Sequence, residues 1–115
     1  METRTRAREF LQQFYPELSS QPYHCSKWHP KKNCWWFGIS PSTLEGASTV
    51  LLLGKTQDRF QVFRVPIAYL DANLALLSRV ASGKKEGTIN LHIHTETHID
   101  LRASDTVTFA QFALN

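Results

Sequence analysis

The sequence lacks the features that would mark a secreted or membrane protein. Only two of its 115 residues are cysteines, whereas a disulfide-stabilised secreted domain usually carries more. No apolar run approaches the roughly 20 residues that cross a bilayer. The polar start of the chain does not contain the apolar stretch of a signal peptide. We therefore expect a cytoplasmic protein with no membrane contact.

Common catalytic and nucleotide-binding motifs are also missing. The sequence has no Gly-x-Gly-x-x-Gly fingerprint and no complete Gly-x-x-x-x-Gly-Lys-Ser/Thr phosphate-binding loop. Lys84, Lys85 and Glu86 have the residue types of a nuclease core without its order. Cys25 and His29 could act as nucleophile and base, but no third group that orients them is identified. The sequence thus favours a recognition domain with no catalytic residues and no cofactor of its own.

The positive charge is concentrated in the first third of the chain. The formal net charge is +3 at pH 7, and the segment up to Asn33 has six basic residues against three acidic ones. From Cys34 onward, seven basic residues stand against seven acidic ones. An excess of cations in one segment suggests an anionic partner for it, although ordinary solubility also explains a charge of this size.

Hydrophobic periodicity predicts two helices. Phe10, Leu11, Phe14 and Tyr15 form one apolar stripe of a helix over residues 3–15. A second helix is predicted to begin at proline 66, which suits the first helical position, and to end before the glycine at 83.

Continuous or alternating apolar segments predict the strands. The expected strands are 33–39, 49–53, 60–65 and, as two strands or one bent strand, 88–101. We expect 49–65 to be a hairpin, and the other segments are assigned as irregular (18–30), loop (40–46), break (103–105) and strand or short helix (106–114). Because no strand–helix–strand unit repeats, we expect one α+β domain over residues 1–115. Its predicted form is a small curved, mostly antiparallel sheet or open β-barrel with two packed helices.

The segment from Lys27 to Phe37 is the first candidate binding site. It contains all three tryptophans together with three lysines and a histidine. Lysines bind phosphates, and an aromatic ring stacked on a base contributes roughly 1–3 kcal/mol. In a strand, Trp35 and Trp36 face opposite ways, so one of them is expected in the core, whereas Trp28 lies in a polar loop. The predicted nucleic-acid-binding residues are Lys27, Trp28, His29, Lys31, Lys32, Trp35, Trp36, Arg4 and Arg8, with Arg6 as a further phosphate contact.

The alternating segment from residue 91 to 102 is the second candidate. In an extended strand its polar side chains share one face, namely His92, His94, Glu96, His98, Asp100 and Arg102. Alternate side chains lie about 6.6 Å apart, so they cannot all reach one metal ion, although a turn near residues 95–97 would bring His98 back toward His94. Three interpretations stay open: a wet outer face, a metal site of His92, His94, Glu96 and His98, and a face that contacts phosphate or a base.

Four zinc-compatible side chains lie between residues 24 and 34. These are His24, Cys25, His29 and Cys34. Their spacing matches no common zinc finger, and two adjacent residues rarely bind one ion. We therefore expect cysteines that carry no metal.

The segments 34–39, 50–54 and 59–66, followed by the predicted helix, resemble small β-barrel modules of restriction systems. These are the DNA-recognition domains of McrB-type and related modification-dependent enzymes, with PUA-like, YTH-like or B3-like folds. The resemblance implies a duplex DNA partner, in some members with a flipped base, and pocket roles for Trp28, Trp35 and Trp36. It also implies that a nuclease or ATPase lies on another subunit or domain.

Three functions follow from these observations. The first is a DNA-binding recognition domain of a restriction or phage-defence system, with the reading of modified bases as an option. The second is a metal-dependent enzyme or metal-binding protein that uses the strand from His92 to Asp100. The third is a protein-interaction module that binds through exposed tryptophan and phenylalanine.

Overall fold

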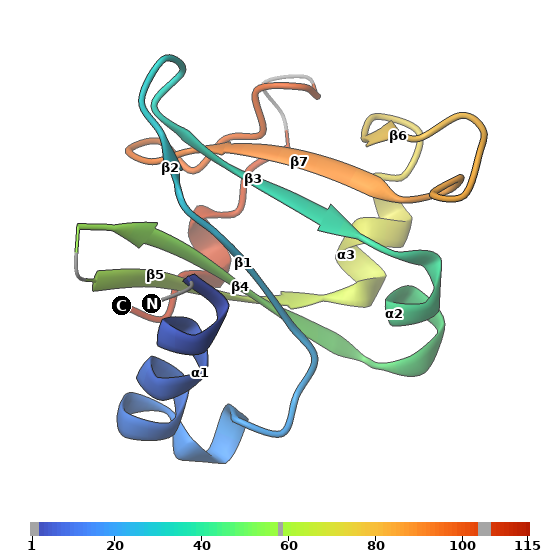
Figure 1. Ribbon diagram of the computed structural model, residues 1–115. Helices are drawn as coiled ribbons and strands as arrows, with labels where there is room; N and C mark the ends of the chain where they lie inside the picture. The colour runs from blue at the N-terminus through green and yellow to red at the C-terminus, as the bar shows by residue number, and fades with distance from the viewer. Residues whose placement is uncertain (1–2, 58, 104–106) are drawn as a thin grey trace.

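Two small sheets pack face to face and form the body of the protein (Figure 1). The computed structural model describes residues 3–57, 59–103 and 107–115. One sheet has the order β1-β4-β5, with strands β1 (Tyr23–Ser26), β4 (Thr49–Thr56) and β5 (Arg59–Pro66). The other has the order β2-β3-β7-β6, with strands β2 (Trp28–His29), β3 (Cys34–Ile39), β6 (Ser78–Arg79) and β7 (Ile89–His94). All strand pairs are antiparallel except β1 with β4, so the predicted α+β fold with open, mostly antiparallel sheets is confirmed.

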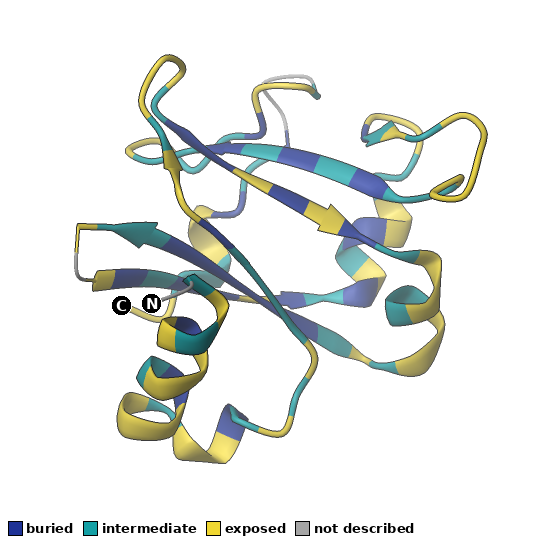
Figure 2. Ribbon diagram, viewed as in Figure 1, coloured by how far each residue is buried: buried dark blue, intermediate teal, exposed yellow. Residues whose placement is uncertain are grey.

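The main core lies between the two sheets. Strands β3 and β7 alternate between core and outer face, and Figure 2 shows β7 switching between buried and half-buried residues. Buried aliphatic and aromatic side chains fill the space between them and β4–β5, chiefly Trp35, Phe37, Ile39, Val50, Leu52, Phe63, Val65, Ile89, Leu91, Ile93 and Phe109. On the outer face, β3 carries Cys34 and Trp36, and β7 carries Asn90, His92 and His94.

A second core lies on the other side of β4. Helix α1 (Thr3–Phe14) places Ala7 and Leu11 against Leu51 and Leu53 of that strand. Residues from Val50 to Leu53 are therefore all fully buried, because each face of β4 meets a different core. This confirms the prediction of a strand buried on both faces, and the hairpin it forms with β5 is confirmed as well.

The second predicted helix is shorter in the structure. Helix α3 (Ile67–Ala72) ends at Asn73, whose side-chain nitrogen donates to the Tyr69 carbonyl at 2.8 Å. Tight turns then lead to β6, yet Leu70 and Leu77 are both buried. The predicted helix is thus confirmed only as far as Ala72. The predicted loop at 40–46 contains a one-turn helix, α2 (Pro41–Gly46).

The segment predicted to be irregular, residues 18–30, contains β1 and β2 after a short 3₁₀ helix, η1 (Pro16–Leu18). Strand β1 runs beside β4, which is distant in the sequence, whereas β2 forms a hairpin with β3. After β7 the chain turns at residues 95–97 and returns, because Ile93 pairs with Asp100. The second short 3₁₀ helix, η2 (Ala110–Phe112), follows, and the predicted break lies largely outside the described residues. No helix among the described residues is long and apolar enough to cross a bilayer.

Candidate nucleic-acid interface

One end of the molecule, which we call the hairpin end, consists of the β2–β3 turn, the turn after β7 and the adjoining ends of β4 and β5 (Figure 1). Asn33 joins the first two, because its carbonyl accepts the Thr95 amide at 3.0 Å and its Oδ1 accepts the Thr95 hydroxyl at 2.7 Å. Its φ of 52° is left-handed, a conformation that asparagine adopts more readily than most residues. Asn33 therefore holds two segments far apart in the sequence side by side.

Trp28 lies exposed on the hairpin that leads to this end. Its ring is 47% exposed, and its Nε1 donates to the same Oδ1 of Asn33 at 2.8 Å. The bond restricts the indole without covering its aromatic faces, so little ordering is needed before a base stacks on it. The predicted lysines at 27, 31 and 32 are all exposed, as phosphate contacts need to be.

Trp36 occupies the outer face of β3 between two imidazoles. Its ring lies 3.9 Å from the ring centroid of His29 and 4.7 Å from that of His92, with interplanar angles of 11° and 9°. We call these three residues the ring stack. Trp36 is 46% exposed, but both of its aromatic faces are covered, so a base cannot stack on it without displacing a histidine. The structure therefore corrects the prediction that Trp36 offers a free stacking surface.

Trp35 belongs to the core. It is 2% exposed, packs edge-on against Phe63 and donates from Nε1 to the Lys55 carbonyl at 3.0 Å. The prediction that Trp35 stacks on a base is wrong for this reason, although the prediction that one ring of the pair is structural is confirmed. Only part of the indole borders open space, at the base of a neighbouring pocket.

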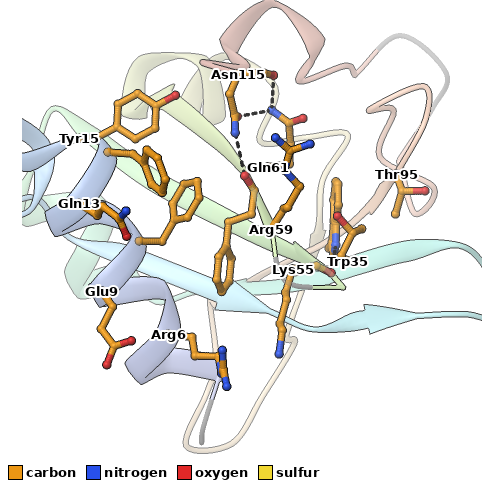
Figure 3. A pocket seen from close by; sticks show the side chains of 14 residues that line it. Arg6, Glu9, Gln13, Tyr15, Trp35, Lys55, Arg59, Gln61, Thr95 and Asn115 are labelled. Carbon is orange, nitrogen blue, oxygen red and sulfur yellow. Dashed lines mark hydrogen bonds between the residues drawn. The ribbon is translucent and has the colours of Figure 1, made fainter.

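That pocket, which we call the basic pocket, is about 680 Å³ in volume and lies between α1 and the β4–β5 turn (Figure 3). Its size falls in the range of roughly 300–1,000 Å³ that suits small organic groups. Among the described residues of its lining, the cationic side chains are Arg6, Lys55 and Arg59, and the acidic side chain is Glu9. Its apolar wall consists of Phe10, Phe14, Tyr15, Phe60 and Trp35, while Thr95 connects it to Asn33 and so to Trp28.

Sequence reasoning missed Lys55 and Arg59. Lys55 follows Gly54 and precedes Thr56, which reproduces the end of a phosphate-binding loop. These residues lie in β4 and lead into a second strand rather than a helix, so no helix N-terminus is available for a phosphate. The two cations reach the pocket because the β4–β5 turn lies opposite α1, which the local pattern does not reveal.

Arg4 and Arg8 lie elsewhere than the predicted site. Arg4 is 4.8 Å from the centroid of the Tyr23 ring and borders a second hollow with His24. Arg8 is one helical turn further along and shares this flank of α1, whereas Arg6 lines the basic pocket from the other flank. The structure thus groups Arg6 with the hairpin end and separates Arg4 from it.

The Asp100 carboxyl binds the backbone of His92, which belongs to the ring stack. It is 1% exposed, and its Oδ1 accepts the amides of His92 at 3.0 Å and Arg102 at 3.1 Å. Among the described residues, neither its Oδ2 nor the Nδ1 of His92 has a hydrogen-bond partner, although both atoms are buried. Burial raises the pKa of Asp100, whereas burial and then the charges of Arg102, Lys32 and His29 lower the pKa of His92.

The predicted metal ligands do not come together. The turn at residues 95–97 brings the His98 amide within 3.0 Å of the His94 carbonyl, as expected, but the His98 ring packs against Phe63 at 4.9 Å. The Nδ1 of His94 is taken up by the amides of Glu96 and Thr97. Within the described ranges, no three histidine, cysteine or carboxylate side chains are placed to hold a metal ion. This holds for the strand from His92 and for the group between residues 24 and 34.

None of the protein-family models, curated proteins or solved structures compared with this chain matches it. The function is therefore inferred from the geometry of the hairpin end.

Proposed function

We propose that this chain is a DNA-binding recognition domain of a cytoplasmic restriction or phage-defence system, and that it binds through the hairpin end. The observation that carries the proposal is the basic pocket, with three cations and an aromatic wall, next to the exposed ring of Trp28. Cations can pair with the phosphates of a nucleic acid, and aromatic rings can stack on its bases. An end that offers both to one ligand suits a nucleic acid better than a purely apolar or purely charged partner.

Phosphate contacts come from two groups of cations. Lys27, Lys31 and Lys32 extend from the β2–β3 hairpin, and Arg6, Lys55 and Arg59 surround the pocket. Such contacts fix the position of the duplex but carry no sequence information. They also release counterions, so the logarithm of the binding constant should fall by about 0.9 per phosphate contact for each decade of salt.

Base contacts come from Trp28 and the basic pocket. The fixed indole of Trp28 can stack on a base at a distorted or open step. The pocket has room and aromatic lining for a base that has left the duplex stack, and its cations can hold the adjoining phosphate. Discrimination between modified and unmodified bases would take place there. A nuclease or ATPase that acts on the bound DNA would lie on a partner.

The first test compares two lysine pairs. Lys31→Ala/Lys32→Ala should weaken binding to a fluorescent duplex and make the salt dependence shallower by about 1.8 in fluorescence anisotropy. Lys84→Ala/Lys85→Ala removes the same charge from the exposed turn before β7 and should leave both unchanged. Equal losses in the two variants, or no binding of single-stranded or duplex DNA of any methylation state at low salt, would refute the proposal.

The second test removes the stacking ring. Trp28→Ala should weaken binding by roughly 1–3 kcal/mol, which is about 5- to 150-fold, and Trp28→Phe should restore part of it. Leu76→Ala, which truncates another exposed side chain of similar exposure, serves as the control. If Trp28→Ala binds DNA as tightly as the unmodified protein, the ring does not contact a base.

A further inference from the structure

The outer face of β2, β3 and β7 gathers cationic groups around one indole. His29 and His92 cover the two faces of Trp36, and both lie within the 6 Å at which a cation interacts favourably with a ring. Lys32 and Arg102 are close enough for their charges to act on His92. Four groups that carry or can carry positive charge therefore share a small area.

Among the described residues, the charges that lower the pKa of His92 are those of Arg102, Lys32 and His29. Asp100 is the nearest carboxyl, but it is buried, and its Oδ1 is occupied by two backbone amides. His94 lies on the same face of β7, with its Nδ1 turned to the amides of Glu96 and Thr97. Cations gathered in this way form a site that an anion would stabilise.

We propose that the ring stack, with Lys32 and Arg102, is a binding site for a phosphodiester group, and that His29 and His92 bind it in their protonated form. A protonated imidazole carries two N–H donors, and the buried Nδ1 of His92 leaves that ring its Nε2 for a ligand. The indole between the two rings stabilises the charge of each. The assignment of the phosphate to a DNA backbone rests on the function proposed above. The anion chemistry does not, because inorganic phosphate has the same recognition elements.

Proton uptake is the consequence that makes this site testable. Without a ligand, burial and then the neighbouring cations lower the pKa of His92. A bound phosphate would stabilise the protonated ring and raise that pKa again. DNA should therefore bind more tightly as the pH falls through the histidine range, by up to about tenfold per pH unit for each proton taken up.

The first experiment follows the histidine ring resonances of the intact protein by NMR while inorganic phosphate is added between pH 5.5 and pH 8. We expect the signals of His29 and His92 to shift, and the titration midpoint of His92 to rise. His24 on β1 should not respond, because it lies by the second hollow on the opposite sheet. If phosphate leaves the rings of His29 and His92 unchanged, the site is refuted, whether or not DNA binds elsewhere.

The second experiment measures DNA affinity against pH by anisotropy in the unmodified protein and in His29→Gln, His92→Gln and His24→Gln. We expect the pH dependence to persist in His24→Gln and to be lost or strongly reduced in the other two variants. The same pH dependence in all four proteins would overturn the assignment of DNA phosphate to this site. If no DNA binds at any pH but inorganic phosphate shifts the two rings, the DNA-binding function fails and the phosphate site stands with free phosphate as its ligand.

Discussion

The close contact between Gly54 and Trp35 predicts that a larger residue at position 54 destabilises the core beside the basic pocket. A Cβ added at Gly54 would overlap Cδ2 and Cε2 of the indole and lie 2.7 Å from its Cγ. The ring cannot move aside freely, because Trp35 is 2% exposed, packs against Phe63 and donates to the Lys55 carbonyl. Gly54→Ala should therefore force either the ring or strand β4 out of place.

The expected cost follows from two opposing effects. Overpacking a core usually destabilises by about 1–3 kcal/mol, and a rigid ring clamped on two sides belongs at the upper end. Replacing a glycine by alanine in a strand gains about 0.5–1 kcal/mol, because the unfolded chain loses freedom. We expect a net loss of about 2 kcal/mol in the free energy of unfolding.

Urea unfolding monitored by circular dichroism measures this loss, and two controls identify its cause. Gly38→Ala places a Cβ 3.6 Å from the Thr88 methyl group, an ordinary contact, so it should not destabilise. In a Trp35→Leu background, Gly54→Ala should cost much less, since the overlapping ring is absent. If Gly54→Ala costs the same in both backgrounds, the clash with the indole is not the reason for the glycine.

Two further predictions concern stability against pH. Burial raises the pKa of Asp100, so the folded state holds the Asp100 proton more tightly than the unfolded chain does. The free energy of unfolding should therefore fall as the pH rises above about 4. Asp100→Asn should reduce this fall, as measured by urea unfolding. Burial lowers the pKa of His98, so stability present above about pH 6.5 should be lost as the pH drops, and His98→Asn, which tolerates the positive φ there, should lessen that loss. A pH profile that neither substitution alters contradicts both.

The spacing of apolar residues along the chain predicted those elements whose core-facing side chains recur at a regular interval. The alternation of β3 and β7 and the continuous run of β4 specify which side chains leave water, and the structure places them accordingly. The predicted stripe of α1 is buried at Leu11, whereas its Phe14 is 57% exposed. The pattern failed for α3, where the spacing of buried leucines persisted after Asn73 had ended the helix. It also failed for β1, whose strand partner β4 is distant in the sequence, and for β2, which has only two residues and so shows no alternation.

The candidate site divides in the same way. Trp28 and the lysines beside it could be predicted, because they are neighbours in the sequence. The stacking of His92 on Trp36 could not, because it depends on the register between β3 and β7, which places these two residues directly opposite each other. A shift of one residue would have turned the histidine into the core. The two candidate segments were thus identified separately, and the register makes them one face.

The net charge of each part of the sequence does not predict where the cations lie on the folded surface. The later two thirds of the sequence are balanced in charge, yet they supply Lys55 and Arg59 to the basic pocket and place Arg102 near His92 of the ring stack. The first third has the excess, yet α1 divides its arginines between opposite flanks. Folding therefore assembles the cations of the hairpin end from both halves of the chain. An anionic partner would be recognised by this arrangement in space, which is why the lysine pairs at 31–32 and 84–85 should behave differently although they are equal in charge.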